Sequence, residues 1–202
     1  MEIQEYRGIR GLVAAEVLTD TTEEITFGTP FAVAGVAELS KTTKSSTETH
    51  YYDNAPAVAL DSTGADEVTI SASAIPLDVY GKLTGQRYDE AKGMLVEGVR
   101  ESKYFAIGYI TKNTSGTEIF VWRLKGKFNV PDFTHNTEDD GAEANGQELV
   151  FTGIMTTNKC DENGTKPAKA AIVDTGKNKN VTETAFFAKV HTPDEVPPVT
   201  AA

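Results

Sequence analysis

The stretch IFVWRLKGKFNV, residues 119–130, alternates large apolar side chains with basic and polar ones. The apolar positions are Phe120, Trp122, Leu124, Phe128 and Val130, and the positions between them include Arg123, Lys125, Lys127 and Asn129. A period of two residues is the signature of a β-strand with one buried face. Burial contributes about 1.5–3 kcal/mol per large apolar side chain. We therefore expect a strand that buries its aromatic face and turns its basic residues toward solvent or a neighbouring molecule.

The regions around this strand also favour β-structure. Residues 104–111 precede it and join it through NTSG at 113–116, which is a hairpin signal. Residues 67–74 alternate apolar and polar side chains, with Val68, Ile70, Ala72 and Ala74 on one face. Further strands are predicted at residues 12–17, 31–39 and 147–157.

One helix is predicted between Pro76 and Gly85. Proline is tolerated in the first turn of a helix, and glycine commonly follows the last turn. Leu77, Tyr80 and Leu83 recur at three-residue steps and form one apolar stripe. A weaker helical pattern spans residues 182–189. The sequence thus predicts a mainly β fold with one flanking α-helix.

Composition limits the classes of function. The chain has 202 residues and a formal net charge of -11, enough length for one domain with a real core. A protein this acidic lacks the Lys and Arg that displace counterions from phosphate backbones, so nucleic-acid binding is not expected. Its single cysteine, Cys160, excludes an internal disulfide. No apolar segment reaches the ~20 residues of a membrane helix, and the N-terminal residues do not resemble a signal peptide.

No motif indicates an enzyme, a cofactor or a metal ion. Gly93 and Gly98, like Gly141 and Gly146, have the spacing of a phosphate-binding loop but lack its lysine. The three histidines, at 50, 135 and 191, are far apart in the sequence. The acidic residues of 138–143 lack the alternation of a calcium loop, and we interpret them as a solvated turn. We expect no catalytic, cofactor-binding or metal-binding residues.

Two segments do not fit a compact sandwich. Residues 40–61 are rich in Thr, Ser and Lys and contain Tyr51 and Tyr52. This segment is much longer than the usual connection of about 4–6 residues, and long ordered loops are usually functional. Residues 193–202 contain prolines and small residues, which is typical of a flexible tail.

A series of short motifs in fixed order resembles the major tail proteins of siphophages, in particular the phi13-type family. The motifs are GIRGLVAAEV at 8–17, FGTP at 27–30, SSTETHYYDN at 45–54, IPL at 75–77, YD at 88–89, GMLVE at 93–97, YFAIGY at 104–109, FVWRLKGKF at 120–128, VDT at 173–175 and TAFFAKV at 184–190. The resemblance covers nearly the whole chain, and it is weakest at residues 165–171. None of the motifs is diagnostic by itself.

The resemblance implies a tail-tube-type β-sandwich or barrel with one flanking helix and a long extended loop. Residues 1–158 would form the sandwich, 159–192 an extension packed on it, and 193–202 the tail. Such proteins form stacked hexameric rings around a lumen that conducts DNA without binding it. The implied partners are further copies of the chain and the tape measure, tail tip and tail terminator proteins. The implied location is the virion, after assembly in the cytoplasm of the host bacterium.

Two groups of residues are candidates for this role. Residues 40–61 are expected to be a stacking arm, because tyrosines are common anchors at interfaces. Its proposed contact residues are Lys44, Thr47, Tyr51, Tyr52 and Asp53. An acidic lumen is expected from the net charge, and its proposed lining residues are Glu67, Glu118 and Glu148.

Two other classes of function remain open. One is a β-sandwich module that binds carbohydrate or a cell surface, although residues 161–202 offer only Phe186 and Phe187 as aromatic contacts. The other is the tube protein of a contractile injection system, which shares the architecture of the phage tail tube. A sheath gene beside this one would favour that second alternative.

Overall fold

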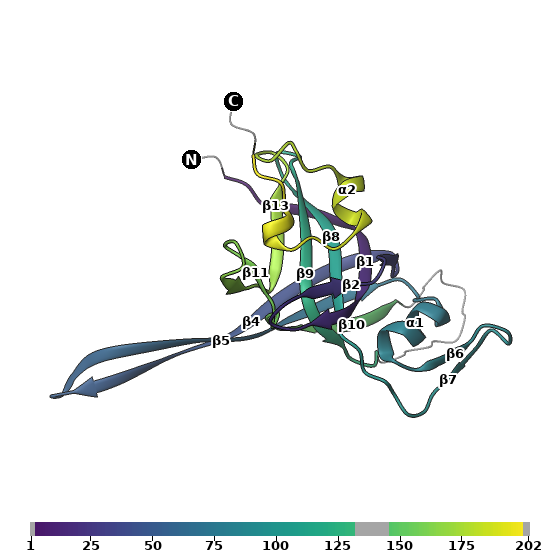
Figure 1. Ribbon diagram of the computed structural model, residues 1–202, viewed down its shortest axis with the longest axis horizontal. Helices are drawn as coiled ribbons and strands as arrows, with labels where there is room; N and C mark the ends of the chain where they lie inside the picture. Colours follow the sequence, from purple (N-terminus) through teal and green to yellow (C-terminus); the bar gives the residue numbers. More distant parts are fainter. Residues whose placement is uncertain (1–2, 132–145, 200–202) are drawn as a thin grey trace, which may run out of the picture.

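The computed structural model describes residues 3–131 and 146–199, and it is mainly β, as the sequence predicts. The strands are β1 Tyr6–Asp20, β2 Ile25–Phe27, β3 Phe31–Ala32, β4 Val36–Tyr52, β5 Ala55–Ala72, β6 Arg87–Asp89, β7 Met94–Val96, β8 Phe105–Asn113, β9 Glu118–Phe128, β10 Gln147–Gly153, β11 Lys159–Asp161, β12 Lys166–Pro167 and β13 Ala170–Asp174. The helices are α1 Leu77–Thr84 and α2 Glu183–Ala188, followed by a 3-10 turn at Pro193–Glu195. Figure 1 shows a body of crossed strands from which β4 and β5 project together.

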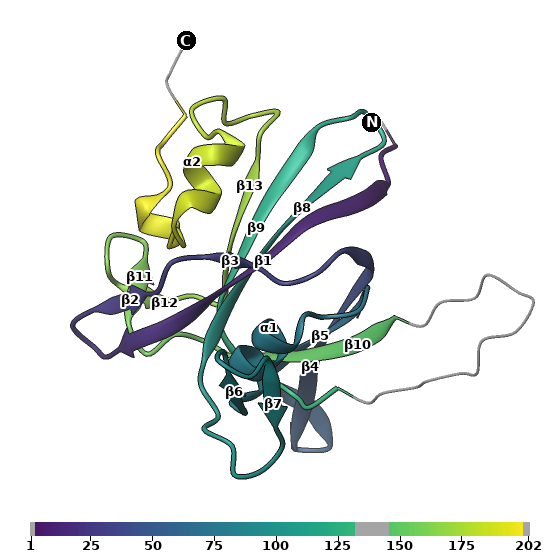
Figure 2. The same ribbon diagram turned by 90° about the vertical axis from the view of Figure 1, so that its right-hand side faces the viewer.

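Nine strands form one antiparallel sheet that folds over on itself. Its main path runs β2-β1-β8-β9-β10-β5-β4, while β13 also pairs with β9 and β3 with β1. Strand β9 pairs with β13 over its first half and with β10 at its end. Because β9 changes partner, β10, β5 and β4 turn across the face of β1 and β8 and enclose a core (Figure 2).

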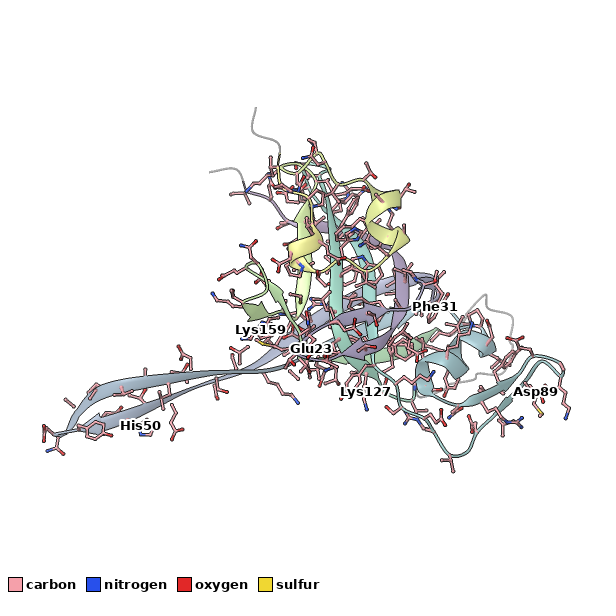
Figure 3. The ribbon with its side chains drawn as sticks, in the orientation of Figure 1. Glu23, Phe31, His50, Asp89, Lys127 and Lys159 are labelled. Carbon is pink, nitrogen blue, oxygen red and sulfur yellow. The ribbon has the colours of Figure 1, made fainter. Side chains whose placement is uncertain are left out.

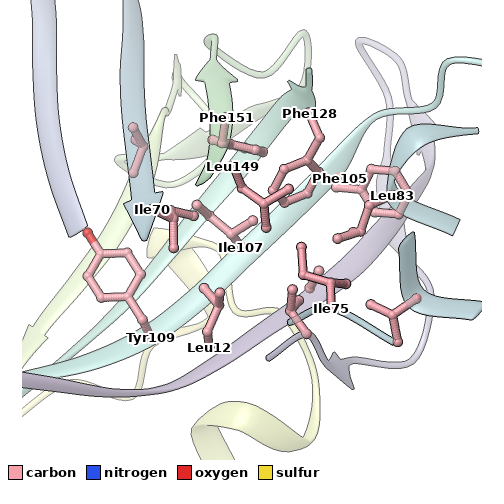
Figure 4. Close-up of a cluster of buried hydrophobic side chains, with 14 of the residues drawn as sticks. Leu12, Ile70, Ile75, Leu83, Phe105, Ile107, Tyr109, Phe128, Leu149 and Phe151 are labelled. Atoms are coloured by element: carbon pink, nitrogen blue, oxygen red, sulfur yellow. The ribbon is translucent and has the colours of Figure 1, made fainter. Parts of the chain in front are cut away.

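The first core lies between these two parts of the sheet and is closed at one end by α1. Its fully buried side chains include Ile70, Ile107, Leu149 and Phe151, all with 0% exposure (Figure 4). The second core lies on the opposite face of β8 and β9, under α2. Trp122 is its centre and donates a hydrogen bond from Nε1 to the carbonyl oxygen of Phe186 at 2.9 Å.

Strand β9 is buried on both faces, in contrast to the sequence prediction. Trp122 faces the second core, whereas Phe128 lies in the first core with Phe105. The pairing moves from Ile107↔Arg123 to Phe105↔Gly126, which inserts one extra residue in β9. Such a β-bulge reverses the side-chain alternation, so the predicted single face is divided between two cores.

Helix α1 begins after Pro76 and ends before Gly85, whose φ of 74° is left-handed, as predicted. Its buried face consists of Val79, Tyr80 and Leu83. The expected stripe is wrong at Leu77, which is 49% exposed.

The C-terminal residues pack on the same body. Strand β13 extends the sheet beside β9. The helix predicted at residues 182–189 is confirmed as α2, and the Thr182 side chain caps its first turn. Residues 193–202 were expected to be a flexible tail; residues 200–202 lie outside the described residues, and the structure gives residues 193–199 defined contacts. Asn178 donates a hydrogen bond to the Pro197 carbonyl at 2.8 Å, and Thr192 and Glu195 form a capping box.

Residues 40–61, expected to be a long loop, are the outer parts of β4 and β5. Their ladder continues to the pair Tyr52↔Ala55. Asp53 and Asn54 have φ of 51° and 65°, and two successive left-handed residues form the tight turn that matches the twist of a hairpin. We call residues 44–63 the arm; at about 3.4 Å per residue it extends roughly 30 Å from the body (Figure 1).

Candidate assembly surfaces

The predicted contact residues of the arm are exposed. Tyr51 and Tyr52 are 66% and 64% exposed beside the turn at Asp53. Thr47 donates a hydrogen bond across the ladder to Asp61 at 2.7 Å. His50 marks the distal part of the ribbon in Figure 3.

The arm also carries apolar residues that the sequence analysis did not select. Val58 and Leu60 are 44% and 54% exposed, and they pair with His50 and Glu48. Val58 and Leu60 are two positions apart in β5, and residues at this spacing lie on the same face of a strand. They therefore lie next to each other on one face of the ribbon. Their spacing of two residues was a signal of this stripe, hidden by the interpretation of the segment as a loop.

A two-stranded ribbon is a weak structure by itself. Neither edge of the arm between Ser45 and Ser62 is paired with another strand of the described chain. Isolated two-stranded hairpins are marginally stable in water, and open edges are templates for another strand. The arm therefore has the features of a segment that completes its contacts on another molecule.

The root of the arm is fixed by Asp66 and three cations. The Asp66 carboxylate lies 3.2 Å from Arg123 Nη1, 3.1 Å from Lys169 Nζ and 3.8 Å from Lys41 Nζ. Thr43 donates a further hydrogen bond to it at 2.9 Å. Burial alone would raise the pKa of Asp66, but hydrogen bonds from Lys169 and Thr43 and the nearby cationic charges hold it below its ordinary value.

This cluster joins separate parts of the chain. Arg123 comes from β9, Asp66 from β5 and Lys41 from β4, and Lys169 also donates a hydrogen bond to the Gly64 carbonyl. Asp66 is 5% exposed, so it needs paired charges to remain ionised in the interior. The ionic cluster therefore holds the start of the arm in a fixed direction relative to the body.

Two of the three predicted lumen residues share one face of the sheet. Glu67 on β5 and Glu148 on β10 are exposed on the outward face of β10, β5 and β4. Glu38 on β4 joins them, because it pairs with Ser71, the partner of Glu148. The remaining side chains in this part of the outward face are hydroxyl-bearing or aliphatic: Ser40, Thr42, Thr69, Ser71, Val150 and Thr152.

Sequence reasoning missed Glu38, although it lies in the strand predicted at 31–39, because only the pairing of β4 and β10 with β5 brings it beside Glu148. Leu39 and Lys41 occupy the inward row of β4, and a lysine there breaks the expected alternation of apolar and polar residues. Lys41 is tolerated inward because it reaches Asp66. At the other end of the outward face, Lys44 Nζ lies 4.0 Å from Glu67 Oε2.

Glu118 does not belong to this face. It begins β9, at the opposite end of the strand from the residues that pair with β10. Its carboxylate accepts a hydrogen bond from Arg10 Nη2 at 2.8 Å, and Arg10 also binds Glu183 at 2.7 Å. The hydrogen bond from Arg10 lowers the pKa of Glu183. Arg10 on β1 therefore links Glu118 on β9 to Glu183 on α2.

The basic residues of β9 are not turned to solvent as expected. Arg123 is buried against Asp66, and Lys125 forms a nearly buried ion pair with Asp20. Lys127 is half-buried, with its ammonium 4.5 Å from the ring centroid of Tyr104. Lys127, labelled in Figure 3, pairs with Thr152, which lies on the outward face of β10, β5 and β4. One basic residue therefore borders the glutamates of that face.

Within residues 3–131 and 146–199, no group of His, Cys, Asp and Glu side chains is arranged to hold a metal ion. Residues 138–143 lie outside the described residues. Cys160 is buried, and burial raises the pKa of its thiol. The helices in the described part of the chain are too short or too polar to cross a membrane.

No protein-family model matches the sequence, and no curated protein matches it.

Proposed function

We propose that this protein is the structural subunit of a non-contractile phage tail tube, with no enzymatic role. In this proposal, six copies form a ring and rings stack around a lumen that conducts DNA. The partners are other copies of the chain, together with tape measure, tail tip and tail terminator proteins. The site of action is the virion.

The arm carries the proposal. It projects from the body, leaves both strand edges open and exposes Tyr51, Tyr52, Val58 and Leu60. A hairpin that binds elsewhere on an identical molecule makes a heterologous contact, and heterologous contacts that do not close a ring build open filaments. An exposed ribbon with a fixed root is therefore well suited to join one ring to the next.

The outward face of β10, β5 and β4 supports the same function. Glu38, Glu67 and Glu148 lie on a sheet face otherwise lined mainly by hydroxyl groups. A surface of this charge repels phosphate backbones and makes no direct base contacts, so DNA would slide past it. This requires that β10, β5 and β4 line the lumen.

Removal of the arm tests the proposal. Residues 46–62 are replaced by Asn-Gly, so that Ser45 and Thr63, which are paired in the ladder, flank a tight turn. The body should keep its melting temperature, because its two cores and the Asp66 cluster are untouched. Electron microscopy of the concentrated protein should show hollow tubes for the intact chain and none for the variant.

A double variant outside the arm, Met94→Ser with Val99→Ser, removes two other exposed apolar side chains and should still form tubes. If the intact chain forms no tubes, even with the phage's tail-tip proteins added, the proposal fails and a binding module becomes the better interpretation. Normal tubes from the armless variant would remove the arm from the stacking contact.

A further inference from the structure

A groove lies on the body between the root of β4 and the strands β1, β8, β9 and β13. It has a volume of about 670 Å³, within the ~300–1,000 Å³ of sites that bury a ligand. Its walls are mainly apolar: Ile9, Leu39, Tyr109, Ile119, Val121 and Ile172. Ile172 is 62% exposed there, so the groove presents hydrophobic surface to the outside.

The deep wall of the groove carries excess positive charge. Arg123 lines it, Lys41 lies nearer the surface with its side chain 38% exposed, and Lys169 binds the same Asp66 carboxylate. The single carboxylate of Asp66 thus pairs with three cations. The Nε of Arg123 is buried and has no hydrogen-bond partner in the described structure. The surplus of cations over carboxylates at this wall favours an incoming anion or acceptor. Glu38, at the rim, is the one acidic residue among those that line the groove.

The arm has the opposite character. Beyond Lys44 at its base, the arm contains Glu48, Asp53 and Asp61 and no further Lys or Arg. Its tip combines one of these carboxylates, Asp53, with two exposed tyrosine side chains. A tyrosine supplies a large apolar body and a polar end, which fits an apolar groove with donors on its deep wall.

We propose that this groove receives the tip of the arm from a second copy of the chain. This inference rests on the proposed function and names the surface on which the arm docks. The two sites cannot meet within one chain. Ala37 in the groove and Ala55 at the tip are separated along the hairpin by roughly 50 Å at about 3.4 Å per residue. Each copy then offers one tip and one groove, and the contact propagates along the tube.

Paired cysteines test this contact in the full chain. Ala37→Cys in the groove and Ala55→Cys at the tip are small changes at exposed positions and retain both tyrosines. The native Cys160 is buried. Mild oxidation of concentrated protein should give a ladder of covalent multimers on a non-reducing gel, because each link joins a tip to a different groove. Ile172→Cys with Ala55→Cys is a second pair that probes another groove wall.

The controls are each single cysteine variant and the pair Ala55→Cys with Val99→Cys, since Val99 is 99% exposed outside the groove. Single variants should stop at dimers. A ladder from both groove pairs, at least tenfold stronger than from the Val99 pair, supports the proposal. If tubes form without such a ladder, or if the Val99 pair gives an equal ladder, the docking proposal is wrong. The proposed tube function is not contradicted by either result.

The remaining outcomes separate the two proposals. A groove-specific ladder without tubes supports docking of the arm and contradicts the tube function. Absence of both ladder and tubes overturns both. If no ladder forms, and the groove cysteine becomes protected from oxidation only when tail-tip proteins are added, the groove binds another protein. The proposed occupant is then wrong.

Discussion

The two halves of β5 differ although they belong to one continuous strand. In the body half, Val68 and Ile70 have 0% exposure and lie between β4 and β10. In the arm half, Val58 and Leu60 are about half exposed, and only β4 pairs with them. The boundary is Asp66, where the three cations bind. The same local propensity thus has two outcomes: one half of the strand is buried in the core, and the other half remains exposed, as the proposed docking of the arm requires.

The largest expected effect comes from the boundary itself. Asp66→Ala leaves Arg123, Lys169 and Lys41 without their carboxylate, and breaking a buried ion pair costs about 3–5 kcal/mol. Denaturant unfolding of the monomer measures this loss. Asp61→Ala is the matched control on the same strand, and it should cost at most about 0.5 kcal/mol because it lies in the exposed arm. Equal losses would contradict the division of β5.

Truncation of an apolar residue in each half sharpens the comparison. Ile70→Ala removes a fully buried side chain and should cost about 2–5 kcal/mol of unfolding free energy. Leu60→Ala should change monomer stability by less than about 0.5 kcal/mol but reduce tube formation. Unfolding curves and tube counts by electron microscopy report the two effects separately. A Leu60 variant that unfolds as readily as the Ile70 variant would show that the arm folds with the body.

Acid should act on the body through its ionic clusters. The folded pKa of Asp66 and of Asp20 lies below the ordinary value of 3.8, so their stabilisation is present above that value. It is lost as pH falls from about 5 through the lower folded pKa, at up to about 1.4 kcal/mol per pH unit for each proton. Asp66→Asn should flatten this dependence, whereas Asp61→Asn should leave it unchanged. Parallel curves for the two variants would contradict the role of the cluster.

The smallest expected effect on stability concerns the outward face. Glu38→Lys with Glu148→Lys should change unfolding free energy by less than about 0.5 kcal/mol, because both side chains are exposed. In assembled phage, the same change should slow DNA ejection at low salt and be masked at high salt, since salt screens the added attraction. Gln variants at both positions should have an intermediate effect. Unchanged ejection at low salt would show that this face does not line the lumen.

The sequence predicted the longer strands of the body and α1, because period-two patterns and terminal Pro and Gly are local signals. It did not predict the short strands β2, β6, β7, β11, β12 and β13, and residues 31–39 are divided between β3 and the start of β4. It did not predict which face of β9 each residue occupies, since the bulge between Arg123 and Gly126 depends on pairing with β8. The arm was located correctly but was interpreted as a loop. Its polar strands lack a buried face, and periodicity detects strands only when one face is buried.

The candidate surfaces were predictable in part. Tyr51 and Tyr52 were identified because they lie in a long polar segment and tyrosines are common anchors at interfaces. Arg123 was misplaced because nothing in the sequence links it to Asp66, which lies 57 positions away. Glu118 was misplaced for a similar reason, since its partner Arg10 comes from the first strand. Long-range ion pairs leave no periodic trace in a sequence.

The ladder of the arm restricts how this protein can change in evolution. Side chains alternate between the two faces of a ribbon, so insertion of a single residue would move Val58 and Leu60 to the opposite face. A length change that keeps both faces must add or remove two residues from each strand. Arms of different lengths should therefore differ by multiples of four residues, or about 7 Å of reach. In the proposed tube, the spacing between successive rings would then vary among descendants in discrete steps.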